Sequence, residues 1–250
     1  MRSFEDLVAE AQAADITGWG LDWLEGRASE ERPPWGFAQL LAQRLSTVQA
    51  ALDIDTGGGE VIDEAPVLPP RMAATESHPP NLLRARQRLG PRGVDVAEAT
   101  AERLPFANGS FELVSARHPV RPNWPEISRV LVPDGLYLAQ HVGPASAFEL
   151  IEVFLGPLPE NRRARHPDTE AQDAEAAGLR VETLRTARCR MEFRDIGAIV
   201  WILRKCPWWV PGFTVDAYLP QLRKLDQNLR RGEPFIAHSA RHLIAARKNG

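Results

Sequence analysis

The sequence has only two cysteines, Cys189 and Cys206, and no long apolar run. The two cysteines form no spaced pair, which argues against a disulfide framework and against a cysteine-ligated metal site. No run reaches the ~18 apolar residues that a membrane-spanning helix needs, and the N-terminal residues lack an apolar targeting segment. We therefore expect a cytoplasmic protein that uses neither a membrane partner nor a metal.

The chain also lacks an excess of charge of either sign. Its 30 Lys and Arg residues are balanced by 33 Asp and Glu residues, so the formal net charge is -3. A nucleic-acid-binding protein usually carries a basic surplus, so nucleic acid is not an expected partner. The 250 residues, 44% of them apolar, are typical of one large globular domain or of one domain with an insertion.

The most informative stretch is the run from residue 51 to residue 60. A short apolar segment, 51–54, predicts a buried strand, and three consecutive glycines, 57–59, follow it before an apolar helical pattern begins. Glycine at such a turn permits positive φ and lets a ligand approach the backbone. The stretch 72–76 follows about 20 residues on and predicts a second strand that ends in an acid, Glu76, at the usual distance for a ribose-binding carboxylate.

Three further features complete a pattern that begins with this glycine loop. They are Glu76, the block Ala-Glu-Arg-Leu-Pro-Phe (101–106) with Gly-Ser-Phe-Glu-Leu-Val (109–114), and the block Glu-Ile-Ser-Arg-Val-Leu-Val-Pro-Asp-Gly-Leu-Tyr-Leu (126–138). In order and spacing these stretches resemble the class I S-adenosylmethionine (SAM) methyltransferases, in their small-molecule branch. Four ordered blocks are more specific than one glycine motif. The resemblance is strong over residues 35–142.

Three positions depart from the family pattern. Asp55 stands where the family usually has its first glycine, and Asp134 replaces a glycine in the turn before the fifth predicted strand. Thr100 stands where an acid commonly accepts a hydrogen bond from adenine. Asp55 either crowds the methionine end of SAM or binds the SAM ammonium group, because a carboxylate is stabilised beside a cation.

The alternation of strands and helices predicts an α/β fold. We expect a Rossmann-like, doubly wound, mostly parallel sheet of seven strands with the last strand antiparallel. The predicted strands span 50–54, 71–76, 93–96, 111–115, 135–142, 179–193 and 242–247, and residues 18–34 are expected to be irregular. We expect an N-terminal helical cap at 1–49, a SAM-binding domain at 50–250, and a helical lid for the acceptor inserted at 194–235.

The resemblance implies a set of cofactor-binding residues. They are Asp53, Asp55, Gly57, Gly58, Gly59, Glu76, Ser77, Thr100, Ala101, Glu102 and Arg117. The glycines would approach SAM, whose product is S-adenosylhomocysteine, and Glu76 would bind the ribose. Plainer interpretations exist for Asp53 as a cap, for Gly57 and Gly59 as turn glycines and for Glu76 as a surface acid, but the ordered pattern favours the site.

The methyl acceptor is expected where the fourth and fifth predicted strands end. His118 and His141 follow these strands and are candidate proton acceptors, because the unperturbed pKa of histidine lies near neutrality. For His118 a hydrogen-bonded loop histidine is an equal alternative. Trp35, Trp208 and Trp209 are candidate substrate contacts, although such aromatic residues are more often core. Trp19 and Trp23 share this ambiguity.

The sequence therefore predicts an enzyme that methylates a small-molecule acceptor on an oxygen, nitrogen or carbon atom. Alternatives are an RNA base methyltransferase of the ribosomal-RNA type and a non-catalytic SAM-binding protein. The cysteine zinc module and basic surface of the ribosomal-RNA type are missing. A dinucleotide-dependent oxidoreductase is disfavoured by the blocks at 101–106 and 109–114. The identity of the acceptor and the oligomeric state stay open.

Overall fold

The computed structural model describes residues 2–18 and 20–250 and divides into two compact units. Trp19 lies outside the described residues. Unit 1 comprises residues up to 32 together with 144–164 and 188–240, and unit 2 comprises 33–143, 165–187 and 241–250. Within the described residues, no helix is long and apolar enough to cross a membrane.

Unit 2 contains the α/β sheet. Its strands are β2 (Ala50–Ile54), β3 (Arg71–Glu76), β4 (Asp95–Glu98), β5 (Phe111–Arg117), β6 (Leu131–Val142) and the unit 2 parts of β7 (Leu179–Phe193) and β8 (Phe235–Lys248). The strand order is β7-β8-β6-β5-β2-β3-β4, and neighbours from β6 to β4 run parallel. β8 pairs antiparallel with β6, as the sequence predicts.

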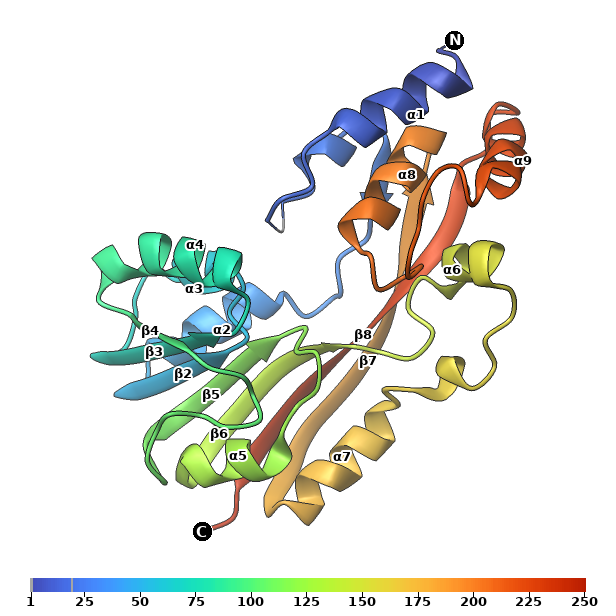
Figure 1. Cartoon of the computed structure of the whole chain (residues 1–250). Helices are drawn as coiled ribbons and strands as arrows, with labels where there is room; N and C mark the ends of the chain where they lie inside the picture. The colour runs from blue at the N-terminus through green and yellow to red at the C-terminus, as the bar shows by residue number, and fades with distance from the viewer. Residues whose placement is uncertain (1, 19) are drawn as a thin grey trace. The chain divides into compact units, whose positions relative to one another are not determined.

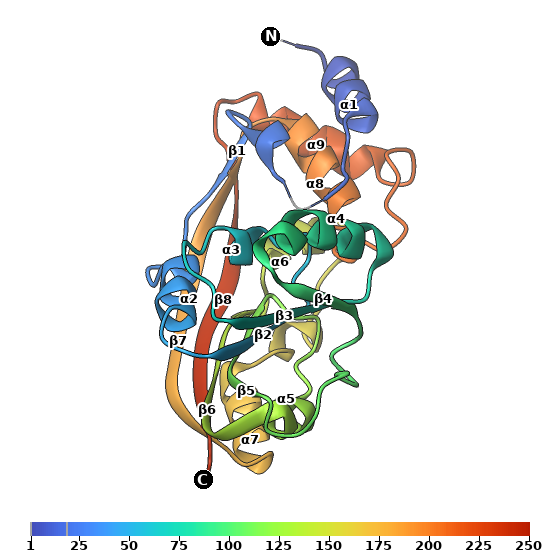
Figure 2. The same ribbon diagram turned by 90° about the vertical axis from the view of Figure 1, so that its left-hand side faces the viewer.

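Helices cover both faces of this sheet. They are α2 (Phe37–Leu45), α3 (Glu60–Asp63), α4 (Pro79–Leu89), α5 (Trp124–Val130) and α7 (Pro167–Ala176). Figures 1 and 2 show α3 and α4 along one face and α5 and α7 along the other. One apolar cluster joins α2 and α4 to the first face, and a second joins α5 and α7 to the opposite face. The fold is thus the three-layer arrangement that buries a parallel sheet on both sides.

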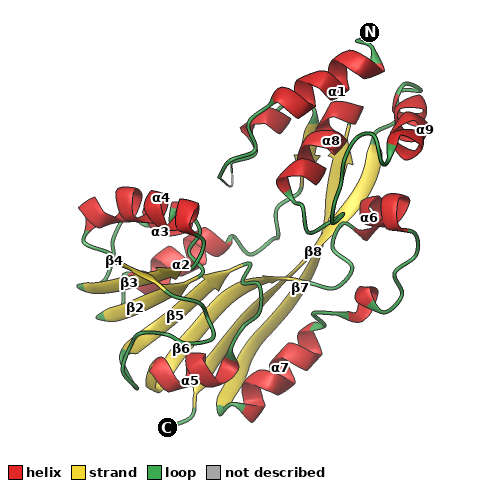
Figure 3. Ribbon diagram, in the orientation of Figure 1, coloured by secondary structure: helices red, strands yellow, loops and turns green. Residues whose placement is uncertain are grey.

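Unit 1 is built mainly from helices, which are drawn in red in Figure 3. They are α1 (Phe4–Ala13), α6 (Phe148–Leu155), α8 (Ile196–Lys205) and α9 (Leu219–Leu229). One apolar cluster with the buried Trp201 forms their core. The short strand β1 (Ala28–Glu30) pairs antiparallel with the unit 1 end of β7. This strand lies where the sequence predicts irregular structure, so within the described part of the chain the sheet has eight strands rather than the predicted seven.

Two blocks of the family pattern contact each other in unit 2. The Glu126 carboxylate accepts a hydrogen bond from the backbone N–H of Leu104 at 2.8 Å. Arg129 pairs with Glu126 at 2.6 Å and donates to the carbonyl oxygens of Leu104 and Phe106. This ion pair ties α5 to the loop between β4 and β5. The acid and the arginine of the block at 126–138 therefore have a structural role.

Asp134 adopts a left-handed conformation, with φ of 60°. The family has glycine here, and glycine takes positive φ without a steric penalty from Cβ. Aspartate tolerates this region better than most residues because its short polar side chain can bond locally. The departure at Asp134 therefore keeps the turn that the family pattern requires.

We expect Asp134→Ala to lower the free energy of unfolding by about 1 kcal/mol, because alanine at positive φ is strained. Asp134→Gly is the matched control. Its free energy of unfolding should exceed that of the alanine variant by about 1 kcal/mol or more, because glycine adopts positive φ without strain. Urea unfolding of both variants tests this. Equal stability of the two would contradict the strain argument.

Candidate active site

The glycine loop that follows β2 is tight. Gly57 and Gly59 have φ of 64° and 81°. A Cβ on Gly59 would lie 2.8 Å from the Leu89 side chain, so only glycine fits there without a shift. The backbone N–H of Thr56 donates to the carbonyl of Thr75 at 2.9 Å, which fastens the loop to β3. The predicted strand, glycine turn and helix are confirmed, although α3 is only one turn long.

The carboxylate of Glu76, at the end of β3, holds this loop in place. Its Oε2 accepts from the N–H of Gly57 at 2.9 Å, and its Oε1 accepts from the N–H of His78 at 2.8 Å. Glu76 is buried. An ionised carboxylate has about four lone-pair sites, so both oxygens can still accept a further hydrogen bond from a ligand.

Two more carboxylates lie beside the loop. Asp53 is buried in β2, and its Oδ1 accepts from the Ser115 hydroxyl at 2.6 Å. Burial raises the pKa of Asp53 to about 6. Burial, together with the negative charge of Glu76, also raises the pKa of Asp55. Three carboxylates at adjacent strand ends form a site that a bound cation would stabilise.

Asp55 occupies the glycine position of the family motif without changing the backbone path. Its φ is 53°, in the left-handed region that glycine favours. The side chain therefore adds a carboxylate to the cluster while the loop keeps its conformation. The sequence leaves two interpretations of Asp55, crowding of the cofactor or contact with its ammonium group. This geometry is consistent with a contact to a cationic ligand.

The loop also brings a hydroxyl group to the cluster. The Thr56 side chain lies beside Asp53, and against the effect of burial its hydrogen bond to that carboxylate lowers the pKa of Asp53. The cluster of carboxylates and this hydroxyl fit a ligand that carries both a positive charge and several polar groups.

A second group of polar side chains begins at Gln140 on β6. The Trp35 indole N–H donates to Oε1 of Gln140 at 2.7 Å, and Nε2 of Gln140 lies 2.9 Å from Nε2 of His118. An indole nitrogen is only a donor, so the amide oxygen must face Trp35 and the amide NH₂ must face His118. His118 therefore accepts at Nε2 and carries its proton on Nδ1.

This arrangement makes His118 a weak base. Burial is the largest cause that lowers the pKa of His118 to about 3, followed by the positive charges of Arg241 and Arg117. Protonation of His118 at Nε2 would also place its N–H donor opposite the amide N–H donor of Gln140, which is unfavourable. The imidazole is therefore neutral near pH 7, and its role as a proton acceptor stays a prediction. Sequence reasoning missed Gln140, whose only signal was its place beside His141.

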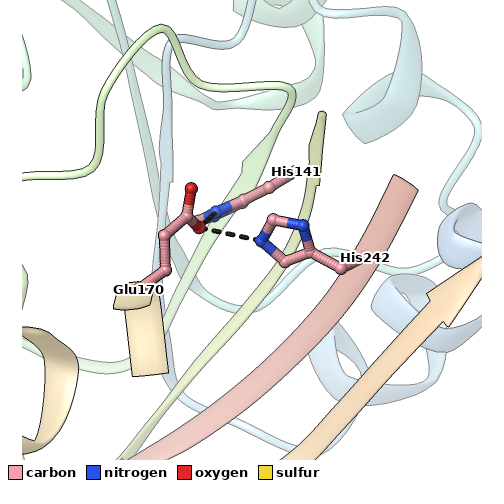
Figure 4. Close-up of side chains that lie close together, drawn as sticks. All are labelled: His141, Glu170 and His242. Carbon is pink, nitrogen blue, oxygen red and sulfur yellow. Dashed lines mark hydrogen bonds and ion pairs between the residues drawn. The ribbon is translucent and has the colours of Figure 1, made fainter. Parts of the chain in front are cut away.

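His141 belongs to a buried cluster on the other face of the sheet, shown in Figure 4. Its Nδ1 lies 2.5 Å from Oε2 of Glu170, and its Nε2 lies 2.9 Å from the hydroxyl of Tyr137. His242, which is opposite His141 on β8, places Nε2 2.8 Å from the same Glu170 oxygen. Burial would raise the pKa of Glu170, but the hydrogen bonds from the two histidines outweigh it and lower the pKa to about 2.

The three ligand atoms lie within 4.8 Å of one another, which is a spacing that a metal ion can use. Both histidine nitrogens, however, meet one carboxylate oxygen at hydrogen-bond distances. Ligands of one tetrahedral zinc ion at about 2.1 Å would lie ~3.4 Å from each other. We therefore describe this cluster as hydrogen bonds that fasten α7 to β6 and β8. No sequence spacing links Glu170 to the histidines, so the sequence could not predict it.

The remaining predicted residues fall in both units. Ser77 follows β3, Thr100 to Glu102 follow β4, and Arg117 ends β5, all at the carboxyl edge of the parallel strands. Ligands of open α/β sheets bind at this edge. Trp208 and Trp209 belong to unit 1, where Trp208 is 57% exposed and Trp209 packs against the apolar core. Their contact with a substrate, and the lid at 194–235, stay predictions.

Comparisons with known proteins agree with this geometry. Residues 52–139 match the sequence profile of the methyltransferase domain family. A provisionally assigned methyltransferase from Bacillus halodurans is 18% identical, with a TM-score of 0.62 over 85% of this chain and 99% of that one. The YcgJ protein of Bacillus subtilis is 19% identical, with a TM-score of 0.61 over 85% and 98%. No curated protein sequence matches the chain.

A third similar structure contains ligands. It is phosphoethanolamine N-methyltransferase 2 of Haemonchus contortus, in complex with phosphomonomethylethanolamine and S-adenosylhomocysteine. The two chains are 17% identical, and the TM-score is 0.55 over 100% of this chain and 61% of that one. Identities this low show a shared fold.

The sheet order and the glycine loop thus give the chain the fold of the class I methyltransferases. The match to the methyltransferase domain family at residues 52–139 agrees with the resemblance that the sequence pattern indicates.

We expect His118 to stay neutral from about pH 8 to about pH 5, with its proton on Nδ1, because its pKa is about 3. Side-chain ¹⁵N NMR measures both the tautomer and the titration. Gln140→Glu, which replaces the amide donor by an acceptor of the same shape, should raise the pKa of His118. A titration midpoint of His118 near pH 6.5 in the wild-type protein would contradict the assignment of a neutral imidazole with its proton on Nδ1.

Glu170→Gln should lower the free energy of unfolding by about 1–3 kcal/mol at neutral pH, because it weakens two buried hydrogen bonds to a charged group. The pKa of Glu170 is lowered from 4.5 to about 2. Its stabilisation is therefore complete above pH 4.5 and is lost as the pH falls toward 2, so the difference between the variants should shrink over that range. Glu175→Gln, an exposed position on the same helix, is the control. Urea unfolding at several pH values measures this difference. A difference in free energy of unfolding between the wild type and Glu170→Gln that does not depend on pH would contradict the assigned role of Glu170.

Proposed function

We propose that this methyltransferase transfers the methyl group of SAM to a small-molecule acceptor. The observation that carries the proposal is the cluster of Asp53, Asp55 and Glu76 beside the glycine loop. SAM carries a positive sulfonium and an ammonium group, so a negative site at the loop favours its binding. When bound, SAM supplies an electrophilic methyl group.

Each residue of the cluster has an expected task in binding. Glu76 would accept hydrogen bonds from the ribose hydroxyls with the lone pairs that Gly57 and His78 leave free. Asp53 and Asp55 would hold the ammonium group, and the backbone at 57–59 would line the cofactor. Binding of a cation would favour the ionised form of Asp53 and Asp55 and so reverse the effect of burial on their pKa values.

The acceptor side suggests how the reaction proceeds. Methyl transfer mainly requires alignment of the acceptor with the methyl group and exclusion of water. A neutral His118 that is fixed by Gln140 is suited to orienting an acceptor through its Nδ1–H. Such a site suits an acceptor atom that is already nucleophilic, such as an amine or an ionised oxygen.

Two findings favour a small molecule over RNA. The chain has no excess of positive charge, whereas RNA affinity depends on basic residues. The Haemonchus contortus neighbour is in complex with a small phosphorylated amine. SAM turnover with small acceptors, measured beside turnover with RNA, tests the choice. Methylation of RNA alone would refute the proposal.

Glu76→Ala should weaken SAM binding by about 1.5–3 kcal/mol, or roughly 10- to 150-fold, the range for a hydrogen bond to a charged group. Glu76→Gln, which keeps one acceptor oxygen, should lose less. Calorimetry with SAM measures both variants, and circular dichroism checks that each is folded. Unchanged affinity in the alanine variant would remove Glu76 from the cofactor site.

A further inference from the structure

Cationic side chains gather at one end of β5, β6 and β8. Arg117 is paired with Gln140, and Arg241 is paired with Val142. Residues directly opposite each other on neighbouring strands share a face of the sheet, and so do residues two apart on one strand. Arg117, Gln140, Val142 and Arg241 therefore project from the same face, with Gln140 and its partner His118 between the two arginines.

A third arginine reaches the same end from another segment. Arg165, just before α7, donates a hydrogen bond to the carbonyl of Val120 at 3.2 Å. Val120 lies two residues beyond His118, so this bond brings the Arg165 guanidinium to the loop that follows β5. Burial is the largest influence on the pKa of His118, and the charges that act on it, from Arg241, Arg117, His141 and Arg165, all lower it. The environment of His118 is therefore positive.

The carboxylates and the arginines occupy neighbouring parts of the carboxyl edge of unit 2. Asp53, Asp55 and Glu76 lie in or just after β2 and β3, where the cofactor is expected, while Arg117 and Arg241 lie on β5 and β8. The two groups meet at Val120, whose backbone N–H donates to Asp55 and whose carbonyl accepts from Arg165. Arg117 is two residues beyond Ser115, the partner of Asp53, and so borders the cofactor side. Arg241 lies on β8, two strands away from β5. A guanidinium binds carboxylate and phosphate through paired N–H donors.

We propose that the methyl acceptor carries an anionic group, a carboxylate or a phosphate, which Arg241 and Arg165 bind beside His118. The proposal rests on the function proposed above. In it, Arg117 faces the boundary with the cofactor, and His118 and Gln140 orient the neutral part of the acceptor. The anionic group is a handle for binding and takes no part in the transfer of the methyl group.

The test uses the full chain saturated with S-adenosylhomocysteine. Inorganic phosphate and benzoate are the two anionic probes, benzamide is the uncharged match for benzoate, and the ionic strength is held constant with chloride. Binding is followed by NMR of the His118 side chain. We expect phosphate or benzoate to bind and benzamide to bind at least about tenfold more weakly. Binding of phosphate alone indicates a phosphorylated acceptor, and binding of benzoate alone indicates a carboxylic acid.

Arg241→Gln and Arg165→Gln should each lower the affinity for the anionic probe by about tenfold. Arg241→Lys, which keeps the charge, should lower that affinity less. Affinity for S-adenosylhomocysteine should be unchanged in all three. Arg84→Gln, at a half-buried arginine on α4, is the matched control and should change neither affinity.

Binding of neither anion, or equal weakening by Arg84→Gln, would overturn the proposal. An equal loss of affinity for S-adenosylhomocysteine and for the probe would also overturn it, because these arginines would then bind the carboxylate of the cofactor. If the wild-type protein does not bind S-adenosylhomocysteine at all, the proposed function fails, and this proposal fails with it.

Discussion

The hydrogen bond from the Gly57 N–H to the buried carboxylate of Glu76 is the constraint on which the cofactor side of this protein depends. It joins the ends of two parallel strands and fixes a loop in which glycine is needed for positive φ and for the close approach of Leu89. A buried carboxylate is stable only when hydrogen bonds or charges compensate it. The loop and the acid therefore stabilise each other, and both are set for a cationic, hydroxyl-bearing ligand.

The acceptor side depends on a different interaction, the amide of Gln140. Because the Trp35 indole can only donate, the orientation of this amide is fixed, and it in turn fixes the tautomer of His118. Charge differs between the two sides, with carboxylates beside the glycine loop and arginines around His118. A methyl transfer from a cation to an acidic acceptor would use both halves of this arrangement.

Much of the fold follows from local sequence signals. The bounds of β2, β3 and β7 agree with the predictions, because each strand is a β-rich run that ends in a turn residue or a helix cap. β4 begins two residues later than predicted, and β8 begins seven residues earlier, since strand ends depend on pairing with neighbours that the sequence does not display. β1 was missed because its three residues pair with β7, a segment far along the chain that no local pattern links to them.

The candidate site is predictable to a similar degree. The glycine loop and Glu76 are marked by a spacing of about 20 residues, which is a property of one βαβ unit. Gln140, Glu170 and His242 acquire their roles through contacts between distant segments, so no local pattern marks them. Asp55 and Asp134 looked like departures from the family, and the backbone shows both in the conformation that the missing glycines would take.

Hydrogen–deuterium exchange of the protein with and without S-adenosylhomocysteine tests the central claim most directly. If the cofactor binds at the carboxylate cluster, exchange should slow in the peptides that contain residues 55–59 and 76–78, whose amides form the loop and its anchor. Binding that leaves these peptides unprotected, while others become protected, would contradict the account.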